Sequence, residues 1–325
     1  AGMVVSGASF GDKMSPVSDT TNLAAMSAGT DLYTHIKSML YTTVPTYIIS
    51  LVLFTALGLY YSGQVLTEEA LAVFKSNLGI EFAIGPLTLL PLLVLLTLSF
   101  RRTPAEISML ARVGTAIVLA VIFQDRTITE VLNSLHTGYT SSTGNEQLDN
   151  LLSRGGITSM MWTMSLALIA LSLGGILDRG GFVRVLLSGI LKRIKRSASL
   201  MATTIGAGIF SNMSMGEGYL SIIFGGQIFK DSYEEDGLEN HMLSRCLEEG
   251  ATLSTSLIPW TTSGAFITGV LAMSPLEYGP WAFFNYINPM LSIGLAYLGF
   301  GIFRKSERNN KYKVLKTDGN EEANY

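Results

Sequence analysis

Long apolar stretches restrict the fold of this chain more than any other feature of its sequence. A helix that crosses a lipid bilayer needs about 20 mainly apolar residues, and five stretches reach or approach that length: 41–62, 82–100, 107–124, 156–178 and 281–303. Only 14% of the 325 residues are charged, whereas soluble domains average about 25%. This low charge excludes a nucleic-acid binder and predicts an all-α polytopic integral membrane protein embedded in the lipid bilayer.

Two further apolar stretches are interrupted in their middle by polar and small residues. Residues 199–229 are interrupted at 211–218, and residues 243–273 are interrupted at 257–264. Non-helical backbone at membrane depth is tolerated only where protein or a water-filled cavity surrounds it. The first interruption therefore predicts a re-entrant hairpin, and the second predicts a broken helix.

The distribution of Lys and Arg predicts the orientation of the helices, because cytoplasmic loops carry an excess of these residues. When the charged tail at 304–325 is placed in the cytoplasm, most basic residues fall on the same side, including those of an amphipathic basic helix predicted at 179–197. This holds only if residues 199–229 enter and leave the membrane from the cytoplasmic side. The charge distribution thus independently predicts the hairpin and a cytoplasmic C-terminus.

A weak internal repeat links the beginning and the end of the sequence. Residues 11–15 followed by 19–22 resemble residues 250–254 followed by 260–263, and a second match aligns residues 31–45 with 275–289. The predicted orientation makes the two copies run in opposite directions, which is typical of inverted-repeat secondary transporters. The hairpin has no counterpart before Gly11, so the first repeat is expected to be incomplete and the chain to begin partway through a longer protein.

These features predict five regions along the chain. They are the remainder of the first repeat core (1–63), spanning helices that link the repeats (64–178), the cytoplasmic basic helix (179–197), the second repeat core (198–303) and a cytoplasmic tail (304–325).

The first interrupted segment carries the strongest candidates for cation binding. Na⁺ prefers oxygen ligands, and a run of five residues offers carboxylate, hydroxyl and amide oxygens: Ser18, Asp19, Thr20, Thr21 and Asn22. The second copy offers the hydroxyl residues Thr261, Thr262 and Ser263. The alternative is that these side chains only cap the ends of broken helices.

Ionisable residues at membrane depth are the candidates for proton coupling, because they are costly there and by default mark an ion or proton path. Asp12 and Lys13 form one pair, for which the alternative is a structural ion pair between Lys13 and Asp19. Glu217 lies in the hairpin tip and could instead cap a half-helix. Glu248 and Glu249 are interpreted more simply, with Glu249 paired to Arg245 four residues earlier.

Several motifs are absent from the sequence. There is no phosphate-binding G-x-x-x-x-G-K-[ST] loop and no H-E-x-x-H metal motif, and the chain has one cysteine. We therefore expect no enzyme activity, no cofactor beyond the transported ions, and an ion gradient as the energy source.

Three groups of motifs resemble the NhaC family of sodium/proton antiporters. They are Gly11-Asp12-Lys13-Met14-Ser15-Pro16 with Ser18-Asp19-Thr20-Thr21-Asn22, then Met215-Gly216-Glu217-Gly218, then Leu257-Ile258-Pro259-Trp260-Thr261-Thr262 with Phe283-Phe284-Asn285-Tyr286-Ile287-Asn288-Pro289. The family belongs to a wider ion-transporter superfamily in which re-entrant hairpins accompany unwound helices. By this resemblance, residues 19–22 map onto a first ion site, with Asp19 and Asn22 as Na⁺ ligands, and residues 261–263 map onto a second.

The resemblance implies a secondary transporter that exchanges Na⁺ for H⁺ across the bacterial plasma membrane. Some relatives exchange sodium together with organic acids such as malate and lactate, and this alternative stays open. A channel or a structural membrane subunit is less well supported, because neither explains Asp12 and Asp19 at membrane depth. A homodimer is a further open possibility.

Overall fold

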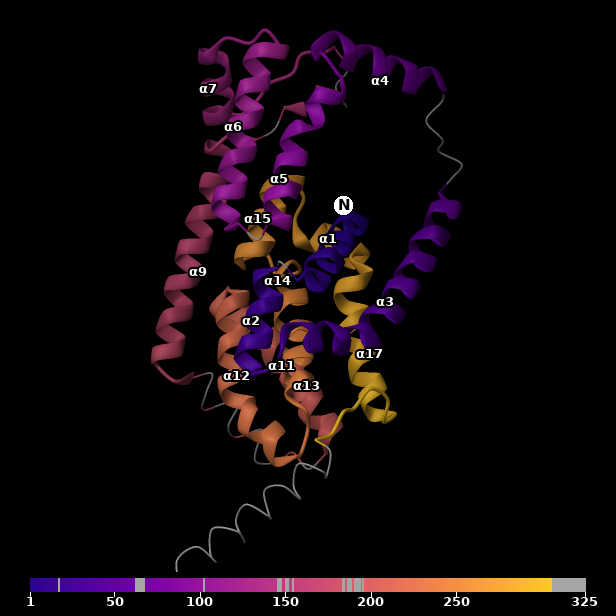
Figure 1. Cartoon of the computed structure of the whole chain (residues 1–325), viewed down its shortest axis with the longest axis vertical. Helices are drawn as coiled ribbons and strands as arrows, with labels where there is room; N and C mark the ends of the chain where they lie inside the picture. Colours follow the sequence, from indigo (N-terminus) through magenta and orange to yellow (C-terminus); the bar gives the residue numbers. More distant parts are fainter. Residues whose placement is uncertain are drawn as a thin grey trace, which may run out of the picture. The chain divides into compact units, whose positions relative to one another are not determined.

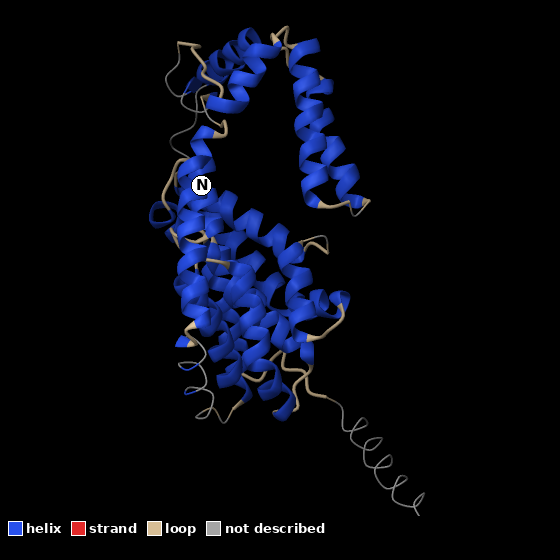
Figure 2. Cartoon of the chain, turned by 90° about the vertical axis from the view of Figure 1, so that its left-hand side faces the viewer, coloured by secondary structure: helices blue, strands red, loops and turns tan. Residues whose placement is uncertain are grey.

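The computed structural model is built of helices and loops. It describes residues 1–16, 18–61, 68–101, 103–144, 148–149, 152–153, 155–182, 185, 189, 194 and 196–305. Within these residues there is no β-strand, and the only strand-like pairing is a single bridge between Leu238 and Arg304 (Figure 2). The prediction of an all-α chain is confirmed for this part of the protein.

The chain forms two compact units, which we describe separately. Unit 1 comprises Ala1–Ser50, Ile169–Gly264 and Pro275–Tyr325, and unit 2 comprises Leu51–Leu168 and Ala265–Ser274. These two units are defined by how compactly their residues pack, whereas the five predicted regions are defined by the internal repeat and the distribution of charge. Those five regions therefore remain a prediction.

Unit 1 contains two broken helices, a helical hairpin and the helix that precedes the C-terminal tail (Figure 1). Its elements are α1 (Gly2–Met14), α2 (Asp19–Ala28), the first part of α3 (Leu32–Tyr60), the last part of α9 (Met161–Arg179), α11 (Ser197–Met215), α12 (Gly218–Glu235), α13 (Asn240–Leu247), the π-helical turn η3 (Glu248–Thr252), α14 (Leu253–Thr255), the start of α15 (Thr262–Leu271), α16 (Pro275–Tyr278), η4 (Gly279–Trp281) and α17 (Phe283–Tyr297). The core of the unit lies where α2, α11, α12 and α13 pack together, around fully buried side chains such as Met201, Ile205, Phe229 and Leu247.

Unit 2 is built mainly from apolar helices that expose their side chains. Its elements are α4 (Glu68–Glu81), η1 (Pro86–Leu89), α5 (Leu90–Phe100), α6 (Ala105–Phe123), α7 (Ile128–Thr137) and η2 (Thr158–Met160), with the remaining parts of α3, α9 and α15. Large apolar residues such as Leu110, Ile122 and Leu168 are more than half exposed. Such a surface suits contact with lipid.

Three helices in the described part of the chain are long and apolar enough to cross a membrane. They are Leu32–Tyr60, Glu106–Phe123 and Thr158–Leu177, and they match the predicted stretches at 41–62, 107–124 and 156–178. Together with shorter apolar helices at Pro86–Phe100 and Thr262–Leu271, they identify a multi-pass membrane protein.

Two predicted spans are shorter than expected, and proline or glycine explains each difference. The stretch at 82–100 becomes helical only at Pro86, because a proline suits the first turn of a helix and disfavours helix in the residue before it. The stretch at 281–303 ends its helix at Tyr297, just before Gly299 and Gly301, whose φ angles of 78° and 66° stop the helix.

The interrupted stretch at 199–229 folds into the hairpin of α11 and α12, which turns at Gly216 and Glu217. The open end of this hairpin lies beside the start of the C-terminal tail. Arg304 donates a hydrogen bond to the carbonyl of Asp236, directly after α12, at 2.9 Å. It also donates to the hydroxyl of Ser197, the first residue of α11, at 2.7 Å. Both hairpin ends therefore lie on the same side of unit 1 as Arg304, where the tail begins.

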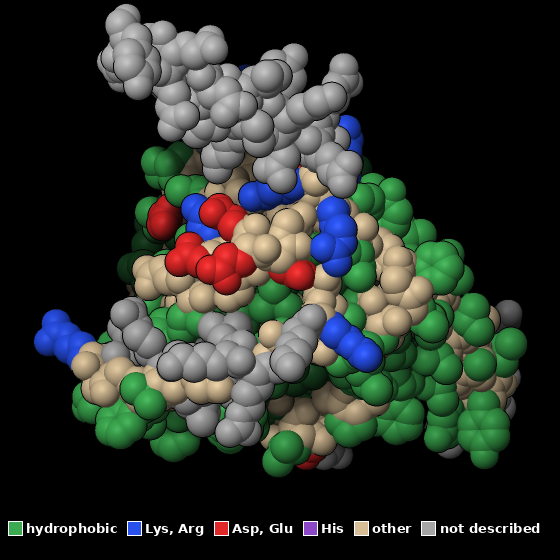
Figure 3. Space-filling model, turned by 90° about the horizontal axis from the view of Figure 1, so that it is seen from below, with side chains coloured by type: hydrophobic (Ala, Val, Ile, Leu, Met, Phe, Trp, Pro, Cys, Tyr) green, Lys and Arg blue, Asp and Glu red, His purple; other side chains and the backbone are tan. Residues whose placement is uncertain are grey.

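Charged side chains gather at this end of unit 1 (Figure 3). Exposed residues there include Asp231, Glu234, Glu235, Arg304 and Lys305. About half of the predicted basic helix at 179–197, and all of the tail after Lys305, lie outside the described residues.

Candidate functional site

The first broken helix is interrupted between Met14 and Asp19. Pro16 lies in this interval, where it removes one backbone donor and leaves carbonyl groups without helical partners. The Thr21 hydroxyl donates to the carbonyls of Asp12 (3.3 Å) and Lys13 (3.2 Å), and the Asn22 amide donates to those of Pro16 (3.0 Å) and Ser18 (2.6 Å). Thr21 and Asn22 thus satisfy the backbone of the break, which is the capping alternative left open by the sequence.

Hydroxyl and carboxyl groups meet at this break. The Ser18 hydroxyl donates to Oδ1 of Asp12 at 2.8 Å. The Thr20 hydroxyl lies 3.3 Å from Oδ2 of Asp12 and 3.4 Å from Oε1 of Glu248. Thr20 therefore bridges the first broken helix to the second.

The hydrogen bonding around Thr20 suits a further positive charge or a proton, although Asp12 is itself exposed. An ionised carboxylate only accepts hydrogen bonds, and a hydroxyl has one proton to donate. Thr20 cannot satisfy Asp12 and Glu248 at once when both are ionised. A proton on one carboxyl group, or a cation between the oxygens, resolves the conflict.

Glu248 and Glu249 are the functional candidates that sequence reasoning missed. Both side chains are 0% exposed, and their Oε2 atoms accept no hydrogen bond within the described residues. They start the π-helical turn η3, where the regular α-helical hydrogen bonding is interrupted, and such turns are frequent at functional sites. Two adjacent carboxylates in an otherwise apolar stretch were the sequence signal that could have identified them.

Lys13 is fully buried and forms an ion pair with Glu249, with Nζ and Oε1 3.7 Å apart. It also donates a hydrogen bond to Oδ1 of Asn288 at 2.7 Å, while Thr42 donates to the same oxygen of Glu249 at 2.5 Å. The expected alternatives, Lys13 with Asp19 and Arg245 with Glu249, are wrong: in the described structure the Lys13 ammonium and the Glu249 carboxylate pair with each other. Their pairing connects residues 236 positions apart, beyond the reach of local spacing rules.

Glu217 at the hairpin tip has two hydrogen-bond donors. The backbone N–H of Tyr219 donates to Oε1 at 3.2 Å, which makes Glu217 the N-cap of α12, and the Thr262 hydroxyl donates to Oε2 at 2.7 Å. The Tyr219 hydroxyl in turn donates to Asp19 at 2.6 Å. The hairpin tip thus contacts both broken helices. The capping alternative describes Glu217 well, and its part in proton coupling stays a prediction.

The second break, between α14 and α15, has a different character from the first. The Thr261 hydroxyl is buried and donates to backbone carbonyls within the same turn, including that of Ile258 at 2.9 Å, so it stabilises the break itself. Thr262 reaches Glu217, whereas no hydrogen bond within the described part of the chain connects Ser263 to the first site. Nearby, Asn212 donates to Ser254 at 2.7 Å and keeps an unpartnered buried Oδ1 within the described structure.

The structure therefore unites only part of the predicted set. Asp12, Ser18 and Thr20 converge with Glu248, which was not predicted, while Asp19 is bound to Tyr219; both Asp12 and Asp19 are exposed. No group of three or more His, Cys, Asp or Glu side chains that could hold a metal ion occurs among the described residues. A cluster of two carboxylates and two hydroxyls instead suits a hard cation such as Na⁺, which as cargo needs only transient ligands.

A multi-pass membrane protein with ionisable groups buried at helix breaks has the features of a secondary transporter rather than an enzyme. The chain belongs to the Na⁺/H⁺ antiporter family, whose pattern matches residues 7–300.

Relatives of known name support this assignment. The chain is 38% identical over 312 residues to the Na⁺/H⁺ antiporter NhaC of Alkalihalophilus pseudofirmus, covering 96% of this chain and 67% of that protein. It is 37% identical to NhaC of Bacillus subtilis, covering 92% of this chain and 66% of that protein. It is 31% identical to the malate-2H⁺/Na⁺-lactate antiporter of Bacillus subtilis, covering 97% and 67%. The chain thus spans about two thirds of the length of these relatives, and no solved structure matches it.

Proposed function

We propose that the protein exchanges Na⁺ for H⁺ across the cell membrane. The observation that carries this proposal is the placement of the Thr20 hydroxyl between the carboxyl groups of Asp12 and Glu248, at 3.3 and 3.4 Å. Membership of the Na⁺/H⁺ antiporter family supports the choice of ions.

The physical basis of the exchange is competition for a buried negative charge. An ionised carboxylate in a low-dielectric interior is costly unless it gains a proton or a counter-ion. Glu248 is fully buried; the Thr20 hydroxyl contacts its Oε1, and its Oε2 has no hydrogen-bond partner among the described residues. Binding Na⁺ would replace the proton that otherwise neutralises the site, so the two ions cannot occupy it together.

An inverted repeat in this unit is part of the proposal, and the direction of the helices supports it. Asn240, at the start of α13, donates to the carbonyl of Gly29 at the end of α2 (3.1 Å). Further along, Glu248 contacts Thr20 at the start of α2. The two broken helices are therefore antiparallel, as an inverted repeat requires.

The helices that follow the two breaks add to this support. α3 and α17 each contain a proline, Pro45 and Pro289, and the amide of Asn288 donates to the Thr46 hydroxyl at 3.1 Å. The same two segments were aligned from the sequence alone. A proline at the matching position of each helix, next to a hydrogen bond between the two helices, is what we expect if α3 and α17 are equivalent helices of two inverted repeats.

We also propose that the hairpin of α11 and α12 is re-entrant and that the C-terminus is cytoplasmic. The contacts of Arg304 with both ends of the hairpin support a common side for all three segments. Basic residues favour the cytoplasmic side, and the tail is rich in them.

The test uses the complete protein in everted membrane vesicles from a host without its own sodium/proton antiporters. A pH-sensitive dye reports the transmembrane pH gradient, and addition of NaCl should collapse it, whereas KCl should have less effect. Glu248→Gln should abolish the response because the exchangeable charge is lost. The matched control is Glu235→Gln, an exposed residue at the end of α12, which should behave as wild type.

Two outcomes would contradict sodium/proton exchange as proposed. Wild-type activity in Glu248→Gln would remove Glu248 from the site. A response to sodium only when malate or lactate is also present would instead favour organic-acid exchange, the activity named for one relative.

A further inference from the structure

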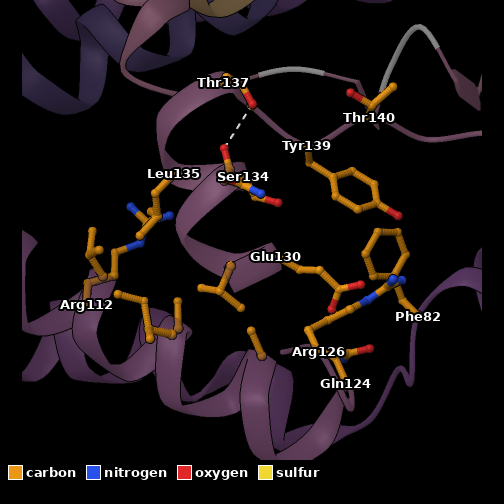
Figure 4. Close-up of a pocket in the computed structure, with 17 residues that line it drawn as sticks. Phe82, Arg112, Gln124, Arg126, Glu130, Ser134, Leu135, Thr137, Tyr139 and Thr140 are labelled. Atoms are coloured by element: carbon orange, nitrogen blue, oxygen red, sulfur yellow. Dashed lines mark hydrogen bonds between the residues drawn. The ribbon is translucent and has the colours of Figure 1, made fainter. Parts of the chain in front are cut away.

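A second candidate site lies within unit 2, in a cavity of about 720 Å³ between α6 and α7 (Figure 4). Along α6 its wall is apolar and includes Val113, Ala116, Ile117 and Ala120. Arg112 and Arg126 line the cavity from different positions along the chain. An apolar wall with cationic groups suits a ligand that has an anionic part and an apolar part.

The polar groups around Arg126 are already paired. Arg126 lies 3.6 Å from the carboxylate of Glu81. The carboxylate of Glu130 accepts hydrogen bonds from the backbone and the hydroxyl of Thr127, at 2.8 and 2.9 Å, in a capping box that begins α7. The backbone hydrogen bond from Thr127 lowers the pKa of Glu130 below its ordinary value. This part of the cavity has little capacity left for another ion.

Arg112 differs, because its guanidinium forms no ion pair or hydrogen bond with the described residues. It lines the cavity near Leu135, in the last turn of α7 (Figure 4). Backbone carbonyls at a helix C-terminus would be natural acceptors for a cation. Here those carbonyls already accept hydrogen bonds from other groups, so they are not free for Arg112. The carbonyls of Asn133, Ser134, Leu135 and His136 accept from Thr137, Gly138, Ile157 and Thr158, in that order.

An unpaired arginine in this position carries a substantial cost. Arg112 lies within α6, one of the apolar helices long enough to cross a membrane. An arginine within a membrane helix is costly unless it meets a partner or reaches the interface. An oxyanion would offset this cost, since the planar guanidinium binds carboxylate and phosphate groups through paired hydrogen bonds.

We propose that this cavity binds an oxyanion, a carboxylate or a phosphate, through Arg112, with the apolar part of the ligand against α6. Two sources carry this chemistry: the headgroup of an anionic phospholipid and a water-soluble carboxylate with a short hydrocarbon chain. Exposed apolar side chains beside Arg112 on α6, such as Leu110 and Val113, leave the helix open to lipid. The site is separate from the residues proposed for ion exchange and does not depend on that activity.

The test measures binding to the purified complete protein in a neutral detergent. Native mass spectrometry compares retention of dioleoylphosphatidylglycerol with that of the zwitterionic dioleoylphosphatidylcholine. Isothermal titration with sodium hexanoate, against sodium chloride at the same concentration, tests the soluble carboxylate. The variants are Arg112→Gln, Arg112→Lys and the matched control Arg126→Gln, which removes an arginine of the same cavity that already has a partner.

Arg112→Gln should weaken binding of the preferred anion by about tenfold or more, because hydrogen bonds to a charged group are lost. Arg112→Lys should retain part of the affinity, and Arg126→Gln should retain most of it. Ala116→Leu adds bulk to the apolar wall and leaves the charge of Arg112 unchanged, so it should also weaken binding. This variant tests the site if Arg112→Gln does not fold. Preference for phosphatidylglycerol identifies the lipid source, and binding of hexanoate identifies the soluble one. Failure of the wild type to bind either anion, or unchanged binding in Arg112→Gln, would overturn the proposal.

Discussion

Thr20 lies at the centre of the candidate ion site, because its hydroxyl contacts carboxyl groups of both broken helices. Its single proton is shared among acceptors on Asp12 and Glu248. When a cation enters, the hydroxyl oxygen can turn its lone pairs toward it and act as a ligand. Thr20 can thus donate a hydrogen bond to a carboxyl group when the site holds a proton, and bind the cation through its oxygen when the site holds Na⁺.

Replacement of Thr20 by valine keeps the shape of the side chain and removes the hydroxyl. We expect Thr20→Val to raise the sodium concentration for half-maximal exchange by about tenfold, since an interaction with a charged group is worth roughly 1.5 kcal/mol or more. Dye-monitored exchange in everted vesicles over a series of NaCl concentrations measures this value. Thr20→Ser should remain close to wild type, and an unchanged half-maximal concentration in Thr20→Val would exclude the hydroxyl as a ligand.

The residues of the first break could be found from sequence, because polar side chains stand out in an apolar chain. Asp12, Ser18 and Thr20 were identified in this way. Glu248 and Glu249 were not, because the i,i+4 spacing to Arg245 offered a local partner that the fold does not use. Lys13 and Thr42 reach Glu249 instead, through contacts between distant segments. Pairings of this kind depend on tertiary packing, which local spacing rules do not describe.

Several helix ends in this chain lie at a proline or a glycine, although Pro45 and Pro289 lie inside helices. The breaks after Met14 and before Thr262 lie at Pro16 and Pro259, and the hairpin turn lies at Gly216, whose φ is 68°. Interruptions, and the type of element around them, were therefore predictable from local chemistry. The closeness of packing between helices was not predictable in this way, because it depends on which residues of distant segments come into contact.

Glycine permits one such close contact, between α11 and η3. A Cβ atom added at Gly208 would lie 2.9 Å from the backbone nitrogen of Ala251, whereas a Cβ added at Gly206 on the same helix would meet nothing within 4 Å. Backbone atoms of η3 cannot move aside without displacing the turn that begins with Glu248. At Gly208 the hairpin therefore packs directly against the turn that carries Glu248.

Alanine substitution should affect stability differently at these two glycines. Gly208→Ala should destabilise the complete protein by about 1–3 kcal/mol through overpacking and reduce exchange. Gly206→Ala should be neutral or stabilise the helix by up to about 1 kcal/mol, since alanine is the better helix former. Thermal unfolding of the purified protein in detergent measures both, and equal shifts of the melting temperature would contradict the close contact between α11 and η3.

At the scale of the whole molecule, the proposed topology places both ends of the hairpin and the C-terminal tail on one side of the membrane. The opposite side should carry the short segment between α15 and α17. Each side offers an exposed residue for labelling: Glu235 at the end of α12, and Leu276, which is 76% exposed, in α16. The chain's own cysteine, Cys246, is 0% exposed and should not react in the folded protein.

Labelling of Glu235→Cys and Leu276→Cys with a membrane-impermeant maleimide tests this topology directly. In intact cells the reagent reaches only the outer side, so Leu276→Cys should react and Glu235→Cys should not. In everted vesicles the pattern should reverse, because the cytoplasmic side is then exposed. Reaction of Glu235→Cys in intact cells would mean that α12 emerges outside, so the hairpin would cross the membrane instead of returning. The tail could then no longer share a side with both hairpin ends, and the antiparallel broken helices would need an explanation other than an inverted repeat.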